Sequence, residues 1–323
     1  MKKFFALISA LLIVAMLLTG CASESTPQSD AIRIGGLKGP TSMGMVKLMH
    51  DNETGKTINK YEFTLAGSAD ELTPKLIKGD IDIAAIPANL ASILYNSTHG
   101  EIKLLAINTL GVLYIVERGD TIHSVEDLKG RKIIGSGKGS TPEFSLRYIL
   151  KENGLDPDED VNIEWKSEHT EVIQTLSQNE DAVALLPQPF VTVASSQLEG
   201  LHMALNLTDE WEKLGNDSTL ITGVLAIRKD FADSHPGQIR DFLKEYEESI
   251  SYVNSNPAEA SVLIEKYGII KAAVAEKAIP YCNIVCIKGE DMVAPMKGYL
   301  KVLYDAEQKS VGGTLPDDDF YIN

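Results

Sequence analysis

Two hydroxyl residues near the start of the sequence, Thr41 and Ser42, are placed where a chain commonly binds ligands. They follow a Gly39–Pro40 turn between a short apolar run at 32–36 and a helical pattern at 45–49. Hydroxyls at a helix start are good N-caps, and the free backbone N–H groups there attract polar or anionic groups. We interpret this stretch as a ligand-binding loop. The alternative is an ordinary strand-to-helix turn.

A second glycine loop repeats this arrangement about one hundred residues later. A predicted strand ends in the loop at 136–142, which contains Ser140 and Thr141, and a helix is expected at 143–153. Ser68 likewise caps a short helix that is expected to run to Lys78. The chain therefore offers hydroxyls at several predicted helix starts.

An internal repeat relates residues 71–87 to residues 171–187 at an offset of 100 positions. Both segments read as a helix, an acidic turn and a small apolar strand that ends in Pro87 or Pro187. An amide follows each proline, Asn89 in one copy and Gln188 in the other. A chance match of pattern is the alternative, but the glycine loop upstream of each copy favours two similar α/β domains.

Strands alternate with helices through the first two thirds of the chain, which predicts layered α/β sheets. After residue 228 the chain is mostly helical. One helix shows an apolar stripe that is expected to face the core, formed by Ile239, Phe242, Leu243, Tyr246, Ile250 and Val253. The Gly-, Pro- and Asp-rich tail at 310–323 is expected on the surface.

No catalytic constellation, metal site or cofactor is predicted. The six histidines do not cluster, and no zinc-ligand spacing appears. His169, at the start of the repeated helix, could face a cleft, but a lone histidine is weak support for catalysis.

Cys282 and Cys286 lie in a stretch, 281–287, that we interpret as extended. Four residues along a strand span about 13 Å, too far for a disulfide. If the segment is helical, the pair lies within range but with poor geometry. Buried structural thiols are the simpler interpretation.

The first 20 residues predict a signal peptide, because Lys2 and Lys3 precede an almost wholly apolar run at 4–18. Residues 18–21 resemble the lipobox of bacterial lipoproteins, which implies cleavage before Cys21 and a lipid on its sulfur. An uncleaved membrane anchor is the alternative, but the run is short for a spanning helix. Residues 21–30 predict a flexible polar tether.

The composition disfavours nucleic acid and anionic lipid surfaces as partners. The formal net charge is −16, and removal of Lys2 and Lys3 with the signal peptide takes it to about −18. About 290 residues follow the tether, enough for two domains with their own cores.

These features resemble the periplasmic-binding-protein superfamily. Within it, they resemble the substrate-binding lipoproteins of ABC importers in the sulfonate, nitrate and thiamine-precursor group. The motifs that carry the resemblance are the lipobox, the loop at 39–41, the run at 79–84, the stretch at 125–133 and the late helices around 256–260. The similarity extends from about residue 31 to residue 305.

The resemblance implies an α/β fold of the type II, two-lobed clamp kind, each lobe a mixed sheet flanked by helices. Lobe one is expected at residues 31–110 plus 228–323, and lobe two at 111–227. The chain is expected to cross from one lobe to the other twice, near 110–114 and 222–224, and these two crossings are expected to form the hinge. The ligand is expected between the lobes at the carboxyl ends of the strands, and closure buries it.

This topology selects candidate ligand-binding residues, which are hydroxyls and amides at helix starts and turns that suit a small polar or anionic ligand. They are Thr41, Ser42, Ser68, Asn89, Ser140, Thr141, Gln188 and Thr222. Lys138 could add positive charge, although simple solvent exposure also explains it. A flat ring would need aromatic walls, for which Phe144, Phe190 and Tyr114 are candidates that also fit core positions.

The expected function is the solute-binding component of an ABC importer, monomeric and lipid-anchored at the extracytoplasmic face of the cell membrane. Its expected partners are a small-molecule solute, the permease and the ATPase. The main alternative is an enzyme on the same fold, of the pyrimidine-precursor or menaquinone-pathway type. The export signal argues against it, because such enzymes work in the cytoplasm. A receptor sensor lobe would need a fused membrane segment.

Overall fold

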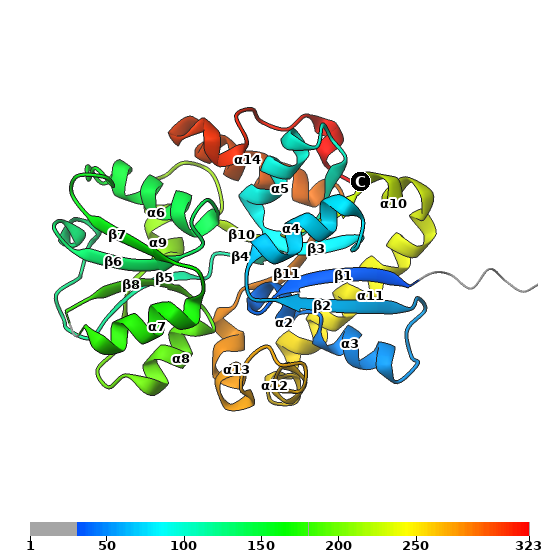
Figure 1. Ribbon diagram of the computed structural model, residues 1–323, viewed down its shortest axis with the longest axis horizontal. Helices are drawn as coiled ribbons and strands as arrows, with labels where there is room; N and C mark the ends of the chain where they lie inside the picture. The colour runs from blue at the N-terminus through cyan, green and yellow to red at the C-terminus, as the bar shows by residue number, and fades with distance from the viewer. Residues whose placement is uncertain (1–30, 180, 323) are drawn as a thin grey trace, which may run out of the picture. The chain divides into compact units, whose positions relative to one another are not determined.

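The computed structural model describes residues 31–179 and 181–322. The predicted signal peptide, the lipidation site Cys21 and the whole of the tether lie outside the described residues. The described chain forms two mixed sheets, each flanked by helices (Figure 1). This arrangement confirms the predicted α/β fold class with two lobes.

The sheet of lobe one has six strands. Their order across the sheet is β11 (Ile284–Lys288), β4 (Ile102–Leu110), β10 (Ile221–Arg228), β3 (Ile83–Pro87), β1 (Ile32–Leu37) and β2 (Tyr61–Ala66). β1 pairs in parallel with β2 and β3, whereas β10 and β11 run antiparallel to their neighbours.

The sheet of lobe two has five strands. Their order is β7 (Asn162–Lys166), β6 (Lys132–Ser136), β8 (Val183–Pro187), β5 (Leu113–Glu117) and β9 (His202–Asn206). β6 pairs in parallel with β7 and β8, and β5 runs antiparallel to β8 and β9.

Helices cover both sheets. Those before the second crossing are α2 (Pro40–Met43), α3 (Val46–Glu53), α4 (Ala69–Lys78), α5 (Ala88–Ser97), η1 (Val125–Leu128), α6 (Thr141–Glu152), α7 (His169–Gln178), α8 (Phe190–Gln197) and α9 (Leu207–Lys213). Those after it are α10 (Lys229–Ser234), α11 (Pro236–Ser255), α12 (Pro257–Lys266), α13 (Ala272–Ala278), η2 (Ile279–Tyr281), α14 (Glu290–Ala306), η3 (Gln308–Val311) and η4 (Asp318–Phe320). None of the described helices combines the length and apolar character needed to span a bilayer.

The predicted internal repeat is confirmed. α4 and α7 begin and end at positions that differ by 100, and so do β3 and β8. In each copy a central strand, β1 or β6, pairs in parallel with the next two strands of the chain. An antiparallel strand, β10 or β5, then lies beside the third strand. The two lobes therefore share one four-stranded arrangement.

The second crossing lies earlier than predicted. The predicted boundary at residue 228 assigns most of β10 to lobe two, but β10 pairs with β3 and β4 in the sheet of lobe one. Its central residues 223–227 are buried, because strands flank it on both sides. The crossing is therefore at 214–220, and not at 222–224. The first crossing, between β4 and β5, lies at 111–112, within the predicted range.

The C-terminal tail was expected on the surface, but part of it is built into lobe one. Phe320 is fully buried, and Tyr321 forms a parallel bridge with Leu104 of β4. The ammonium of the buried Lys103 donates to the backbone carbonyl of Asp319 at 2.6 Å and pairs with its carboxylate at 2.8 Å. These long-range contacts hold a segment whose composition alone favours exposure.

The stretch at 281–287 is extended only in part. A 3₁₀ turn ends at Tyr281, Cys282 keeps a helical backbone conformation, and β11 begins at Ile284. Both thiols are free: Cys282 is buried and Cys286 half-buried. Burial raises the pKa of the Cys286 thiol to about 11.

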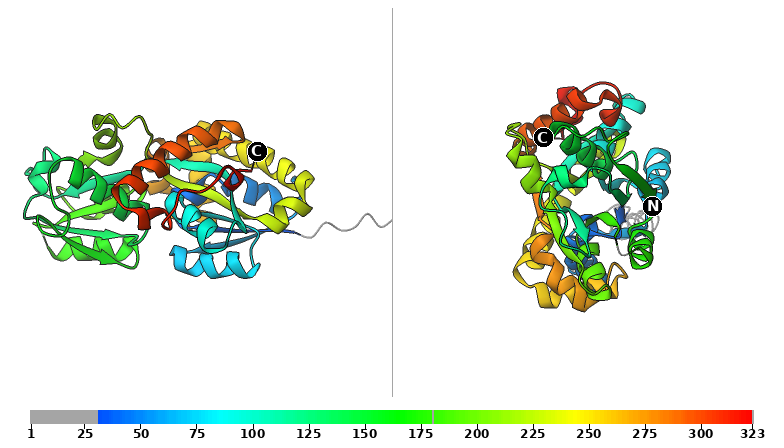
Figure 2. Two further views of the ribbon diagram at one scale, coloured as in Figure 1. Left: turned by 90° about the horizontal axis from the view of Figure 1, so that it is seen from above. Right: turned by 90° about the vertical axis from the view of Figure 1, so that its left-hand side faces the viewer.

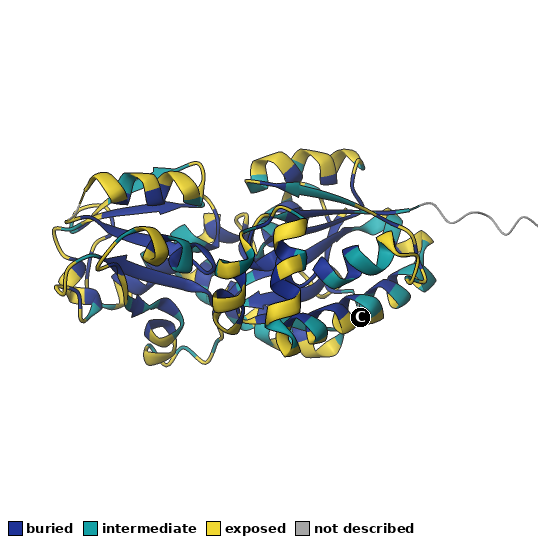
Figure 3. Cartoon of the chain, turned by 90° about the horizontal axis from the view of Figure 1, so that it is seen from below, coloured by how far each residue is buried: buried dark blue, intermediate teal, exposed yellow. Residues whose placement is uncertain are grey.

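The apolar core runs continuously through both lobes. In each lobe, buried strands lie between helices whose outer faces are exposed (Figure 3). One cluster of buried side chains joins Leu104 of β4 and Tyr299 of α14 to Leu146 of α6 and Trp211 of α9. α14 contacts both lobes, because it packs on β4 and β11 and also on α6 (Figure 2).

A buried carboxylate connects three strands of lobe one. Asp82 precedes β3 and is only 2% exposed. Its two oxygens accept hydrogen bonds from the guanidinium of Arg33 in β1 at 2.9 and 2.5 Å. A guanidinium nitrogen of Arg228, at the end of β10, lies 3.7 Å away. The carboxylate raises the pKa of Arg33 mainly through these hydrogen bonds.

Replacement of Asp82 by Ala is predicted to lower the free energy of unfolding by about 2–3 kcal/mol, because two arginines lose a buried anionic partner. Urea denaturation followed by circular dichroism measures the change. The matched control is Lys301→Ala, which breaks the exposed pair with Asp305 and should cost less than about 0.5 kcal/mol. Equal effects of the two substitutions would show that Asp82 does not connect the strands.

Candidate functional site

A cavity of about 450 Å³ lies where strand ends of both lobes meet. In lobe one it is lined by residues that end or follow β1, β2 and β3. In lobe two it is lined by residues that end or follow β6, β7 and β8. Its volume falls in the range of small-molecule sites. The internal repeat thus presents equivalent turns from the two lobes to one space.

Four of the eight predicted ligand-binding residues line this cavity. They are Thr41, Ser68, Ser140 and Thr222. Ser68 and Ser140 are the N-caps of α4 and α6, as predicted. At the start of α4, the carboxylate of Glu71 accepts the backbone N–H groups of Gly67 and Ser68 at 3.1 and 3.3 Å.

The hydroxyls of Thr41 and Thr222 are buried and have no hydrogen-bond partner within the described residues. Thr41 lies inside α2, whose N-cap is Gly39, and so it is not the cap that the sequence predicts. A Cβ added to Gly223, the residue after Thr222, would lie 2.5 Å from the Thr41 methyl group, so the two elements approach closely. Thr41 and Thr222 both line the cavity.

Asn89 and Thr141 lie outside the cavity and hold the lobes together. The Thr141 hydroxyl of α6 donates to the Asn89 side-chain oxygen of α5 at 3.3 Å and accepts from the Tyr299 hydroxyl of α14 at 3.2 Å. The Asn89 amide donates to the carbonyl of Ser310 in η3 at 2.9 Å. We call these four residues the interlobe joint.

Ser42 and Gln188 are also buried away from the cavity. Ser42 packs against Gly36, where an added Cβ would lie 2.2 Å from the serine oxygen. The Gln188 side-chain oxygen accepts the backbone N–H and hydroxyl of Thr192 at 3.3 and 2.8 Å, which closes the start of α8. Helix-start position alone therefore does not aim a side chain into the cavity.

The cavity carries one lysine from the first glycine loop and one from the second. Lys38 follows β1 and Lys138 follows β6, and both are exposed. Neither forms an ion pair within residues 31–179 and 181–322, whereas Lys166, which also lines the cavity, pairs with Glu164. The lining carboxylates Asp70 and Glu168 sit at the starts of α4 and α7, where they complement the helix dipoles.

The two glycine loops differ in backbone conformation. Gly137 and Gly139 have φ of 86° and 75°, a left-handed conformation that favours glycine, whereas Gly39 is extended. The second loop leads directly into the twelve-residue helix α6, and Ser140 turns its hydroxyl back to the Gly137 carbonyl at 2.7 Å.

His169 lines the cavity at the start of α7, as the repeat suggested. Its Nδ1 lies 2.5 Å from the Ser136 hydroxyl, and its ring packs on Phe190 with the centroids 4.5 Å apart. Desolvation lowers the pKa of the imidazole to about 4, so the ring is neutral near pH 7. A neutral imidazole can donate or accept one hydrogen bond to a bound molecule.

Sequence reasoning missed Lys38 and Trp165, which both line the cavity. Each stands at or just after the carboxyl end of a parallel strand, and that position was the available signal. The three proposed aromatic walls, Phe144, Phe190 and Tyr114, do not line it. Within the described residues, no group of three or more His, Cys, Asp or Glu side chains could hold a metal ion.

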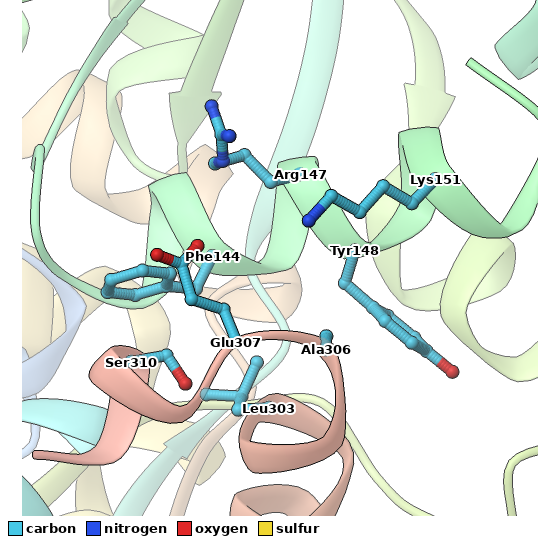
Figure 4. A pocket seen from close by; sticks show the side chains of 8 residues that line it. All are labelled: Phe144, Arg147, Tyr148, Lys151, Leu303, Ala306, Glu307 and Ser310. Carbon is cyan, nitrogen blue, oxygen red and sulfur yellow. The ribbon is translucent and has the colours of Figure 1, made fainter. Parts of the chain in front are cut away.

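Phe144 faces a different hollow, between α6 and the C-terminal segment (Figure 4). Phe144 and Tyr148 of α6 meet Leu303 and Ala306 of α14 there. The hollow measures about 10 Å³, enough for a single water. It belongs to the packing between the lobes.

Replacement of Thr141 by Val is predicted to lower the free energy of unfolding by about 1–2 kcal/mol, because it removes two hydrogen bonds of the interlobe joint. Thr41→Val and Thr222→Val remove hydroxyls without partners and should leave stability within about 0.5 kcal/mol in solute-free protein. Urea denaturation compares the three variants. Equal losses of unfolding free energy in all three variants would mean that the Thr41 and Thr222 hydroxyls already have hydrogen-bond partners within the protein.

Comparisons with solved structures agree with this geometry. An ABC transporter protein from Parabacteroides distasonis superposes with a TM-score of 0.75 at 23% identity, over 91% of this chain and 99% of that one. The aliphatic sulphonate binding protein SsuA from Escherichia coli gives 0.69 at 17% identity, over 87% and 88%. The nitrate-binding protein NrtA from Synechocystis PCC 6803 gives 0.63 at 14% identity, over 87% and 84%. These likenesses show the type II, two-lobed fold.

Sequence comparisons define the family. No curated protein matches the chain significantly in sequence. The family described as "ABC transporter, phosphonate, periplasmic substrate-binding protein" matches residues 51–278. This match covers more than two thirds of the chain, and so the chain belongs to this family of periplasmic substrate-binding proteins of ABC transporters.

Proposed function

We propose that the cavity binds a small oxyanion-bearing solute, a phosphonate or a sulfonate, and that the two lobes close on it. The observation that carries the proposal is the convergence of Lys38 and Lys138, both without ion-pair partners in the described chain, on one cavity. A tetrahedral oxyanion offers several acceptor oxygens, and cationic side chains bind such groups through charge-assisted hydrogen bonds.

The other lining groups support the same ligand class. The unpaired hydroxyls of Thr41 and Thr222 are donors for anionic oxygens. The start of α6, a helix of twelve residues, presents the positive end of its dipole beside Ser140. The matched family is described by phosphonate, and two structural neighbours by aliphatic sulphonate and nitrate. All three are anions.

Lobe one in this proposal comprises residues 31–110 and 221–323, and lobe two residues 111–220. The two crossings at 111–112 and 214–220 serve as the hinge. The closed, solute-bound form is the one that a permease and its ATPase receive, and the protein acts as a monomer that binds the solute without chemical change.

Methylphosphonate and methanesulfonate are predicted to bind wild-type protein, as measured by isothermal titration calorimetry and by a rise in melting temperature. Lys38→Met and Lys138→Met should each weaken binding by about threefold to fivefold, because each removes one exposed charge contact. The matched control is Lys244→Met, an exposed lysine of α11 that lies outside the cavity. Undiminished affinity in both cavity variants, or conversion of the bound compound observed by ³¹P NMR, would contradict the proposal.

We also propose that a lipid on Cys21 tethers the folded body to the membrane through residues 22–30. The support is the sequence of the signal peptide and lipobox. Nine extended residues reach about 30 Å, so the body stays close to a membrane-embedded permease.

Cys21→Ala is predicted to release the protein from the membrane fraction into the medium or periplasm, because the anchor loses its sulfur. Fractionation and immunoblotting measure the distribution. Cys286→Ala is the control, since this thiol lies in β11, and it should leave membrane association unchanged. Retention of the Cys21 variant in membranes would contradict the lipid anchor.

A further inference from the structure

The two tryptophans of the chain have opposite environments. Trp211 is fully buried, its indole N–H donates to the Ser218 hydroxyl at 3.0 Å, and its ring contacts Tyr148 and Tyr299 with centroids 4.8 and 5.7 Å apart. Trp165 lines the cavity and is half-buried. Among residues 31–179 and 181–322 it has no aromatic ring partner, and its indole N–H has no acceptor.

A glycine on the neighbouring strand, Gly135 of β6, makes room for the ring of Trp165. Trp165 pairs with Gly135 across β7 and β6. A Cβ added to Gly135 would lie 2.8 Å from Cζ3 and 3.2 Å from Cε3 of the indole, so the six-membered ring covers the bare backbone there. Gly135 has an ordinary strand conformation and needs no left-handed φ. Its lack of a side chain is therefore what makes room for the ring.

Apolar side chains continue this surface around the cavity. Leu37 and Leu113 line it together with Pro142 and Pro187. The charged and hydroxyl groups, by contrast, come from the two glycine loops, the helix starts, Thr222 and the strand ends Ser136 and Lys166. A solute that is only an oxyanion would leave the half-buried indole, Leu37 and Pro142 partly facing water, at a cost that a larger solute avoids. Leu113 and Pro187 are buried in any case.

We propose that Trp165 is a specificity-determining residue that packs against a flat, apolar part of the solute, so that the preferred ligands are aryl or similarly flat phosphonates and sulfonates. This inference rests on the proposed binding of an oxyanion in the same cavity. The oxyanion meets the lysines and hydroxyls, and the indole covers the attached ring.

Phenylphosphonate and methylphosphonate share one oxyanion and differ in the ring, so they separate the two proposals. Wild-type protein should bind phenylphosphonate at least about threefold more tightly, as expected for one aromatic contact. In Trp165→Ala this preference should fall to about one, with methylphosphonate affinity unchanged. Trp165→Phe should retain most of the preference.

Gly135→Ala displaces the indole without removing it, because the new Cβ occupies the space that the ring uses. It should reduce the preference for phenylphosphonate. Its matched control is Gly237→Ala, where nothing lies within 4 Å of the added Cβ, and which should behave as wild type. Circular dichroism and melting temperature verify the fold of each variant.

Intrinsic tryptophan fluorescence reports directly on contact between the solute and the Trp165 indole. Phenylphosphonate should shift or quench the emission of wild-type protein but not that of Trp165→Phe, in which only the buried Trp211 remains.

Binding of both phosphonates with equal affinity to the wild type would overturn the role of Trp165 and leave the oxyanion site standing. Equal loss of both in Trp165→Ala would also overturn it, since that is the mark of a structural role. Binding of neither compound to the wild type would overturn both proposals.

Discussion

Parallel pairing of a central strand with its two successors is the constraint on which the site depends. In a parallel pair the carboxyl ends of the strands emerge at the same edge of the sheet. β1 with β2 and β3, and β6 with β7 and β8, obey this rule in the two lobes. Six turns are thereby gathered around one cavity, although they are spread over 150 residues of sequence.

Local features of the fold could be predicted from the sequence because nearby residues determine them. The capping of α4 by Ser68 and of α6 by Ser140 depends on a few neighbouring residues, and both were predicted. The repeat was visible because α4 and β3 recur unshifted as α7 and β8. The second crossing was misplaced because β10 joins its sheet through partners more than 100 residues away.

The candidate site was harder to predict because a side chain's direction depends on distant partners. Thr141 and Asn89 stand at turns of the expected kind, yet Tyr299 and Ser310, far along the chain, draw them into the interlobe joint. Trp165, by contrast, was not predicted as a site residue but lines the cavity, because Gly135 on the neighbouring strand leaves space for its ring. Tail residues such as Phe320 are buried by contacts with β4 that composition does not reveal.

The order of the strands in lobe one has a consequence for how the chain folds when it emerges N-terminus first, as it does from a ribosome. Lobe two is continuous in sequence, so all five of its strands are present once residue 220 has emerged. β4 emerges before lobe two, but both of its neighbours, β10 and β11, emerge after it. Its edges therefore stay unpaired while the intervening lobe folds, an exposure that favours aggregation. Completion of lobe one waits for residue 321, because Tyr321 forms a bridge with Leu104 of β4.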